Sequence, residues 1–135
     1  MSGDAPGPWR WVQRSVVLAI HDRQLAEHGG SDGIRDPGAI ESALARPVNL
    51  TSYGDPDIAE LAAAYAYSLA INHGFVDGNK RTAWVTARLF LADNGRHLDF
   101  APMDAIQTME GVAEGRISEA EFAARFRRYL IVVDP

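Results

Sequence analysis

Residues 73–94 read HGFVDGNKRTAWVTARLFLADN, a loop with two glycines followed by a run of helix-forming residues. From position 79 onward apolar side chains recur on nearly every side of the expected helix, and Gly95 follows as a stop signal. A helix that is apolar nearly all round is buried among other elements. We therefore predict a helix from Asn79 to Asn94 at the centre of a helical bundle.

Capping residues, prolines and glycines divide the rest of the chain into similar pieces. Ser15 can cap a first helix that Gly29 and Gly30 end, and an Asp-Pro pair opens each of the next two helices. Ser118 and Glu121 form a capping-box pattern that opens the last helix. The expected helices span residues 15–28, 37–46, 56–72, 79–94 and 102–113, with a last one beginning at 119.

Two connecting segments carry weaker helix signals. Residues 47–54 could be a loop or a short hairpin, and residues 96–100 could be a short extended piece. We predict an all-α fold, a compact single-domain bundle of about six helices that leaves room for one short flap hairpin. Residues 1–14 are assigned to a flexible N-terminal tail and residues 15–135 to the domain.

Composition narrows the functional classes. The chain of 135 residues is 47% hydrophobic and 23% charged, as in a globular domain, and has no cysteine. Disulfides, thiolate metal sites and cysteine nucleophiles are therefore excluded. A net charge of −5 disfavours direct nucleic-acid binding, so the expected partner is a protein or a small ligand. Because neither a membrane span nor a signal-peptide pattern is present, we expect a cytoplasmic protein.

The loop at residues 73–81 offers groups that bind an anion. The first turn of a helix has four unpaired N–H groups and a partial positive charge. Gly78 allows the backbone to approach a ligand closely. Lys80 and Arg81 add two cations at a helix end where cations are normally unfavourable. The combination indicates an anionic ligand, and oligophosphate is the obvious candidate.

Two further side chains suggest chemistry. Asp77 supplies a hard oxygen ligand, which suits magnesium held between a carboxylate and substrate phosphates. His73 lies four residues earlier, and imidazole is a common general base. A base, a metal ligand and a phosphate cradle are the parts needed for phosphoryl or nucleotidyl transfer to a hydroxyl. An ordinary Asp-Gly turn before a helix fits the same residues, so the residues alone leave both interpretations open.

The stretch from His73 resembles the signature of the Fic-fold family, and more closely that of its Doc branch, the death-on-curing toxins. The Doc pattern reads His-x-Phe-x-Asp-(Ala/Gly)-Asn-Lys-Arg-Thr, and it is matched here by His73, Phe75, Asp77, Gly78, Asn79, Lys80, Arg81 and Thr82. A second block also resembles Doc proteins, with AIHD at 19–22, HGG at 28–30 and GIRDPG at 33–38. Two blocks in the right order make the resemblance specific.

The resemblance implies a role for each loop residue. His73 would take the proton from the target hydroxyl, and Asp77 would hold Mg²⁺. Phe75 would anchor the loop in the core. The nucleotide phosphates would be bound by Gly78, Asn79, Lys80 and Arg81.

Two residues depart from the pattern of Fic members that transfer AMP. Lys80 stands where those members have a second glycine, and Trp84 stands where they have an arginine. A lysine there fills space and adds charge, which favours the reversed nucleotide of Doc proteins, with the γ-phosphate presented to the target. The resemblance therefore implies an ATP- and Mg²⁺-dependent protein kinase. Its substrate would be a Ser or Thr hydroxyl of elongation factor Tu, whose phosphorylation blocks translation. AMP transfer to a protein hydroxyl is the alternative.

The resemblance also implies a regulator. Fic proteins are often restrained by a helix with the string (Ser/Thr)-x-x-x-Glu-(Gly/Asn), and this sequence contains no such string. Doc toxins are instead inhibited by a Phd-type antitoxin, whose disordered tail folds on the toxin. The antitoxin, rather than this acidic chain, would contact DNA. A third hypothesis is a catalytically inert module that only binds the antitoxin.

Other residues have structural interpretations. His21 lies on an apolar face, which favours a packed, hydrogen-bonded histidine over a site residue. Trp9 and Trp11 are interpreted as packing residues. The segment 47–54 sits where Fic proteins carry a flap that docks the target chain by strand pairing, although its composition also fits an ordinary loop.

Overall fold

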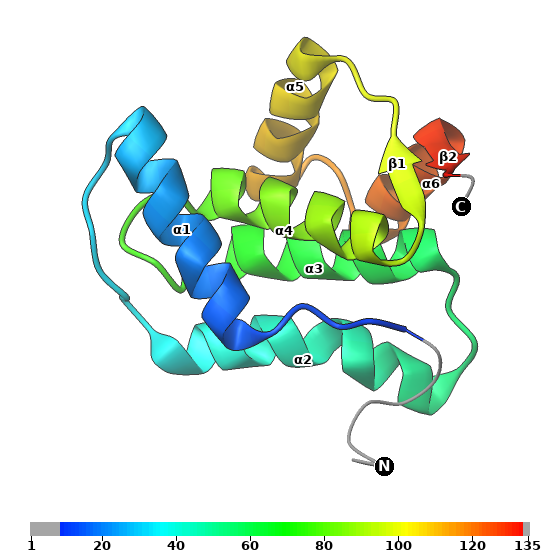
Figure 1. Cartoon of the computed structure of the whole chain (residues 1–135), viewed down its shortest axis with the longest axis horizontal. Coiled ribbons are helices and arrows are strands. Elements are labelled where there is room, and N and C mark those ends of the chain that lie inside the picture. The colour runs from blue at the N-terminus through cyan, green and yellow to red at the C-terminus, as the bar shows by residue number, and fades with distance from the viewer. Residues whose placement is uncertain (1–8, 134–135) are drawn as a thin grey trace.

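The computed structural model describes residues 9–133, which form six helices and one small antiparallel sheet (Figure 1). The helices are α1 (Arg14–His28), α2 (Pro37–Tyr53), α3 (Ile58–Asn72), α4 (Asn79–Asp93), α5 (Pro102–Ala113) and α6 (Glu119–Tyr129), and the strands are β1 (Arg96–Leu98) and β2 (Leu130–Val132). The predicted all-α bundle of about six helices is confirmed. Across the part of the chain that the structure describes, no helix is long and apolar enough to cross a membrane.

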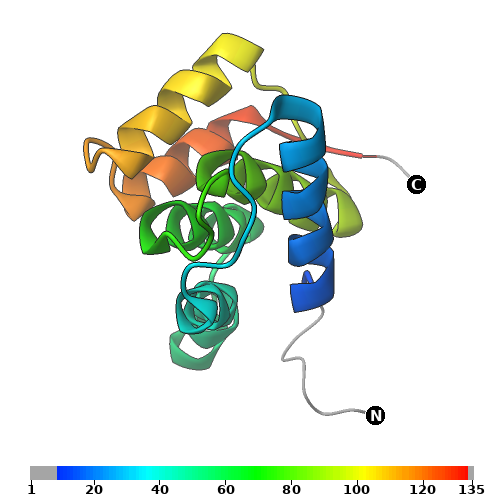
Figure 2. The ribbon, with the colours of Figure 1, turned by 90° about the vertical axis from the view of Figure 1, so that its left-hand side faces the viewer.

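Helix α3, rather than α4, occupies the centre of the bundle. Figures 1 and 2 show α3 between α2 and α4, and it also contacts α5 and α6. Its alanine-rich sequence lets these neighbours approach closely, and it is buried along most of its length. Helix α4 is buried through Ala83, Ala87 and Phe90 but leaves Arg81 and Arg88 exposed. The prediction that residues 79–94 are central was wrong, because these two arginines keep one side of α4 in solvent.

The starts of α2 and α6 follow the capping signals, whereas the start of α3 is shifted. Asp36 caps α2 and Ser118 caps α6, as predicted, and each side chain accepts a backbone N–H three residues on at 3.1 Å. Helix α3 is capped by Asp57 instead of Asp55. The chain is not yet helical at Pro56, so the helix begins two residues later than the Asp-Pro pair indicates.

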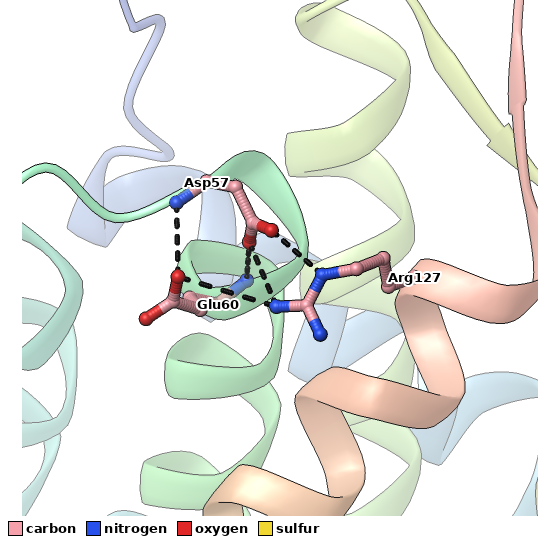
Figure 3. Close-up of polar contacts among 3 residues, drawn as sticks. All are labelled: Asp57, Glu60 and Arg127. Atoms are coloured by element: carbon pink, nitrogen blue, oxygen red, sulfur yellow. Dashed lines mark hydrogen bonds and ion pairs between the residues drawn. The ribbon is translucent and has the colours of Figure 1, made fainter.

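Asp57 also joins the start of α3 to the last turn of α6 (Figure 3). Arg127 donates from Nε to Asp57 Oδ2 at 2.7 Å and from Nη2 to Oδ1 at 3.2 Å. Glu60 completes a capping box with Asp57. The hydrogen bond from Arg127 is the main cause that lowers the pKa of the Asp57 carboxyl. Both side chains are nearly half exposed, so solvent screening limits this ion pair to roughly 0.5–1 kcal/mol.

Residues 47–54, expected to form a loop or short hairpin, are helical instead. Helix α2 continues through Pro47 to Tyr53. Pro47 cannot donate to the carbonyl one turn back, but its ring is buried in the bundle, and this burial offsets the missing hydrogen bond. The small sheet lies elsewhere: β1, within the extended piece expected at 96–100, pairs antiparallel with β2.

The N-terminal segment packs on the bundle before the predicted tail ends at residue 14. Residues 1–8 of that tail lie outside the described residues. Trp9 and Trp11 pack against Phe90, and Val12 is buried and donates its N–H to the Tyr65 hydroxyl at 3.0 Å. The two tryptophans are therefore packing residues, as interpreted. The prediction of a flexible tail therefore does not hold for residues 9–14.

Helix α1 begins slightly before its expected start. Gln13 takes the N-cap position without a side-chain hydrogen bond, so Ser15 lies inside the first turn and does not cap the helix. The helix ends at His28, as predicted, and Gly29 follows with a φ of 79° that suits glycine.

Candidate functional site

The loop between α3 and α4 begins and ends with a left-handed residue. His73 has φ 51° and ψ 47° at the C-cap of α3, and Gly78 has φ 78° at the N-cap of α4. Glycine adopts this conformation at little cost, whereas histidine does so only when the surroundings hold it. Among the described residues, His73 is the one non-glycine residue with positive φ. Such an isolated backbone outlier is typical of a functional position.

The middle of the loop is anchored in the core. Phe75 is only 2% exposed. The side chain of Asn79 spans the turn: its Oδ1 accepts the Phe75 N–H at 3.0 Å, and its Nδ2 donates to the Phe75 carbonyl at 2.9 Å. The anchoring role that the sequence assigns to Phe75 is confirmed. Asn79 shapes the loop, and a phosphate contact by its side chain stays a prediction.

An extended segment, residues 29–36, lies beside this loop and connects α1 with α2. Val76 donates its N–H to the Gly33 carbonyl at 3.1 Å, and Arg35 donates to the Gly74 carbonyl at 2.8 Å. Ile34 and Phe75 form the antiparallel bridge between these hydrogen bonds. The second sequence block therefore packs directly on the first one.

The carboxylate of Asp77 is held by backbone amides. Its Oδ1 accepts the Gly78 N–H at 2.8 Å, and its Oδ2 accepts the Ser31 N–H at 3.2 Å. The bond from Gly78, then that from Ser31, lowers the pKa of Asp77, and the positive charge of Arg81 acts in the same direction. Asp77 is therefore an exposed carboxylate that stays ionised and has a fixed direction.

This carboxylate fits a divalent cation. Each oxygen accepts one N–H, and a carboxylate has about four acceptor positions, so lone pairs remain free on both atoms. An ionised carboxylate with free lone pairs is the ligand that Mg²⁺ prefers. His21, Asp22 and Asp32 also have ligand atoms within 4.8 Å of one another. His21 already bonds the Asp77 carbonyl and both aspartates are exposed, so no metal is assigned to them.

Lys80 and Arg81 lie in the first turn of α4 and line a groove between α4 and α5. The groove has a volume of ≈ 770 Å³ and is lined largely by apolar side chains, among them Trp84 and Met109. Arg88 adds a third cation. None of the ion pairs among residues 9–133 involves these three cations. They are available to an anionic ligand or partner.

The structure places the predicted site residues in one continuous segment, from the end of α3 to the first turn of α4. Of the predicted site residues, His73, Asp77, Lys80 and Arg81 are exposed, and Gly78 and Asn79 are partly buried. Two neighbours of the Asp77 carboxylate were missed in sequence: Gly30, which lies close to it, and Ser31, which donates its N–H to it. His21 is packed and hydrogen-bonded, as predicted, but its partner, the Asp77 carbonyl, was not foreseen. In the sequence, Gly29 and Gly30 indicated a helix stop and formed part of the second block, but nothing in it placed Gly30 beside Asp77.

Comparison with known proteins identifies relatives of the chain. The model of the Fic/DOC family matches residues 11–91, which include both sequence blocks. The chain is 36% identical over 120 residues to the protein kinase doc of Escherichia phage P1, covering 88% of this chain and 94% of that protein. It is 47% identical over 90 residues to the toxin Doc of Mycolicibacterium smegmatis, covering 63% of this chain and 68% of the relative.

Proposed function

The chain belongs to the Fic/DOC family, and on that basis we propose that it is a Doc-type toxin that transfers the γ-phosphate of ATP to a protein hydroxyl. The observation that carries the proposal is the ionised, amide-held carboxylate of Asp77 at the positive start of α4. The names of two relatives, protein kinase doc and toxin Doc, support the kinase activity and the toxic effect.

The proposed reaction assigns one task to each exposed loop residue. The target hydroxyl oxygen forms a bond to the γ-phosphorus, the bond between that phosphorus and the β–γ bridging oxygen breaks, and ADP leaves. His73 accepts the hydroxyl proton as general base. Lys80, Arg81 and the N–H groups of the first turn of α4 hold the phosphate oxygens. Asp77 would hold Mg²⁺, which, when bound, neutralises charge on the phosphates.

Lys80 favours phosphate transfer over AMP transfer. It stands where AMP-transferring Fic members have glycine, and it is exposed in the first turn of α4, beside the mouth of the groove. A cation at this position competes with a nucleotide seated as in those members and attracts phosphates in the reversed orientation. AMP transfer from the same site remains the alternative activity, and it requires the α-phosphate at the position where we place the γ-phosphate.

The proposed target is a Ser or Thr of elongation factor Tu in the cytoplasm, and the segment 33–35 supports a docking position for it. Gly33 and Arg35 use their backbone groups on the loop, so the N–H and carbonyl of Ile34 face away from it. An extended target segment can pair with this free edge beside the loop. Ile34→Pro removes the N–H, so we expect it to raise the KM for the target, whereas Ile34→Ala leaves it near that of the wild type.

We also propose that the groove between α4 and α5 accepts a segment of a Phd-type antitoxin. The lining is largely apolar, and its three cations outnumber its two carboxylates, Asp99 and Glu110, so it fits an amphipathic segment with acidic residues. A segment there would cover Lys80 and Arg81 and so block the phosphate site. Arg88→Glu should weaken antitoxin binding about tenfold or more. Arg128→Glu makes the same charge change at an exposed position of α6. It is the matched control and should bind the antitoxin like the wild type.

A cell-free translation assay tests whether catalysis underlies the toxic effect. Purified protein with ATP and Mg²⁺ should stop synthesis, and His73→Ala should not. His73 is exposed and outside the core, so its removal leaves the fold intact. If His73→Ala stops translation as fast as the wild type, catalysis by His73 is excluded and the protein acts by binding alone.

A further inference from the structure

His21 is a buried polar residue of α1 that reaches the loop from outside it. Its side chain is 3% exposed, and its Nε2 lies 2.8 Å from the carbonyl oxygen of Asp77. A carbonyl oxygen only accepts, so Nε2 carries the proton and donates. The ring also stacks on Phe75, with centroids 3.8 Å apart and planes within 10°. One side chain therefore holds two residues of the loop at once.

The contacts of Asp77 divide into two kinds. Its carboxylate is held by the backbone amides of Gly78 and Ser31, which only a proline substitution at those positions would remove. Its carbonyl is held by His21, a side chain from a distant part of the sequence. The carbonyl and side chain of Asp77 share one α-carbon, so a hydrogen bond that holds the carbonyl also restricts the direction of the Cα–Cβ bond from which the carboxylate projects. His21 is thus the contact through which the Asp77 direction can be altered without altering the loop sequence.

We propose that His21 is a positioning residue for the Asp77 carboxylate: its Nε2–H holds the loop in the conformation that presents this carboxylate to Mg²⁺ and the nucleotide. The part of the proposal that concerns Mg²⁺ and ATP rests on the proposed function. The part that concerns the loop conformation does not. Loss of a group that orients a metal ligand by a hydrogen bond commonly weakens metal binding by about 10- to 100-fold.

Two substitutions separate the hydrogen bond from the packing. His21→Phe keeps an aromatic ring to stack on Phe75 but has no donor. His21→Gln loses the ring but places an amide N–H near the position of Nε2, so it can restore the bond to Asp77. A purely structural role predicts that the variant which packs better is the more active one. A positioning role predicts the reverse order.

The first readout is independent of catalysis. Hydrogen exchange is measured on the full chain at the amides of Val76 and Gly78, which are bonded to Gly33 and to the Asp77 carboxylate. His21→Phe should accelerate exchange at these amides about tenfold or more, while amides inside α6 exchange as in the wild type. His21→Gln should stay within about threefold of the wild type. Equal exchange at Val76 and Gly78 in His21→Phe and the wild type would overturn the proposal.

The second readout is the dependence of phosphate transfer on Mg²⁺ and ATP. His21→Phe should raise the Mg²⁺ concentration for half-maximal rate by about tenfold, with a smaller change in the rate at saturation. His21→Gln should restore most of the difference. If both variants lose activity only in proportion to lost thermal stability, the role of His21 is packing and the proposal fails. Absence of transfer by the wild type contradicts the proposed function instead, and the exchange measurement still decides the role of His21.

Discussion

Gly30 faces the carboxylate of Asp77 so closely that a Cβ atom at residue 30 would lie 2.8 Å from Asp77 Oδ2. Real Cβ atoms do not approach a neighbour to this distance, so one of the two groups would have to move. The φ of Gly30 is 120°, which also favours glycine. The segment 29–36 therefore contacts the carboxylate of Asp77 only because residue 30 has no side chain.

Gly30→Ala should reduce phosphate transfer by about tenfold or more, because the methyl group displaces the Asp77 carboxylate from its position. Gly29→Ala is the matched control: Gly29 also has positive φ, but nothing lies within 4 Å of a Cβ there. Both variants carry the strain of a backbone conformation that glycine adopts and alanine disfavours, roughly 1–3 kcal/mol of folding stability. The prediction is checked by measuring the phosphate-transfer rate and the thermal unfolding of Gly30→Ala and Gly29→Ala. Equal loss of transfer in both variants would mean that the clash with Asp77 is unimportant.

The stability of variants at position 73 should follow the backbone preference of the new residue, whereas phosphate transfer should depend on the imidazole of His73. At φ 51° glycine and asparagine fit well and alanine is strained. We expect His73→Gly and His73→Asn to unfold at a higher temperature than His73→Ala, and all three to lose transfer by about 100-fold or more. Full transfer by His73→Asn, which has no comparable base, would remove His73 from the mechanism.

Asp77→Asn should abolish the Mg²⁺-dependent reaction while changing stability in a pH-dependent way. The folded-state pKa of Asp77 is lowered, so its contribution to stability is present above the unfolded-state pKa of about 3.9. That contribution is lost as pH falls through the folded pKa. Urea unfolding of both proteins should therefore give a constant difference from pH 5 to 8, and a shrinking one below about pH 4. A difference that grows on acidification would show that the carboxylate is not held by Gly78 and Ser31.

Arg127→Ala should lower stability by about 0.5–1 kcal/mol at pH 7 without changing transfer, because its partner Asp57 caps the start of α3, at the opposite end of this helix from the loop. The lowered pKa of Asp57 makes this difference disappear as pH falls through the folded pKa of that carboxyl. Arg127→Lys keeps the charge but not the paired hydrogen bonds, so its stability should lie between those of the wild type and Arg127→Ala. Urea unfolding at pH 7 and pH 2 measures the difference in stability between the wild type and Arg127→Ala. If the difference persists at pH 2, it comes from packing of the arginine stem and not from the ion pair.

Sequence periodicity and caps were sufficient for most of the fold. The end of α3 and the starts of α2, α4, α5 and α6 follow from Asp36, Pro102, Ser118 and the glycine-containing loop. The continuation of α2 through Pro47 could not be foreseen, because it depends on burial of the ring in the folded bundle, which the local sequence does not reveal. The same holds for the centre of the bundle, where the small side chains of α3 accept several neighbours at once.

The residues of the candidate site that lie in one short segment could be predicted from the sequence. The contacts that residues remote in sequence make with that segment could not. His73, Asp77, Lys80 and Arg81 lie in one short segment, so their type and spacing indicated an anion site at a helix start. The contacts made by His21, Gly30 and Ser31 join residues about 46 to 56 positions apart. Spacing within a helix or loop holds no information on such contacts. The second sequence block indicated only that this segment mattered.

The central claim is that this loop transfers the γ-phosphate of ATP, and labelled ATP tests it directly. Purified protein, Mg²⁺ and elongation factor Tu are incubated with ATP labelled in parallel at the γ- or the α-phosphate, with His73→Ala as control. The account predicts transfer of the γ-label alone, lost in His73→Ala. Transfer of the α-label would contradict it, because the nucleotide would then be seated for AMP transfer despite Lys80.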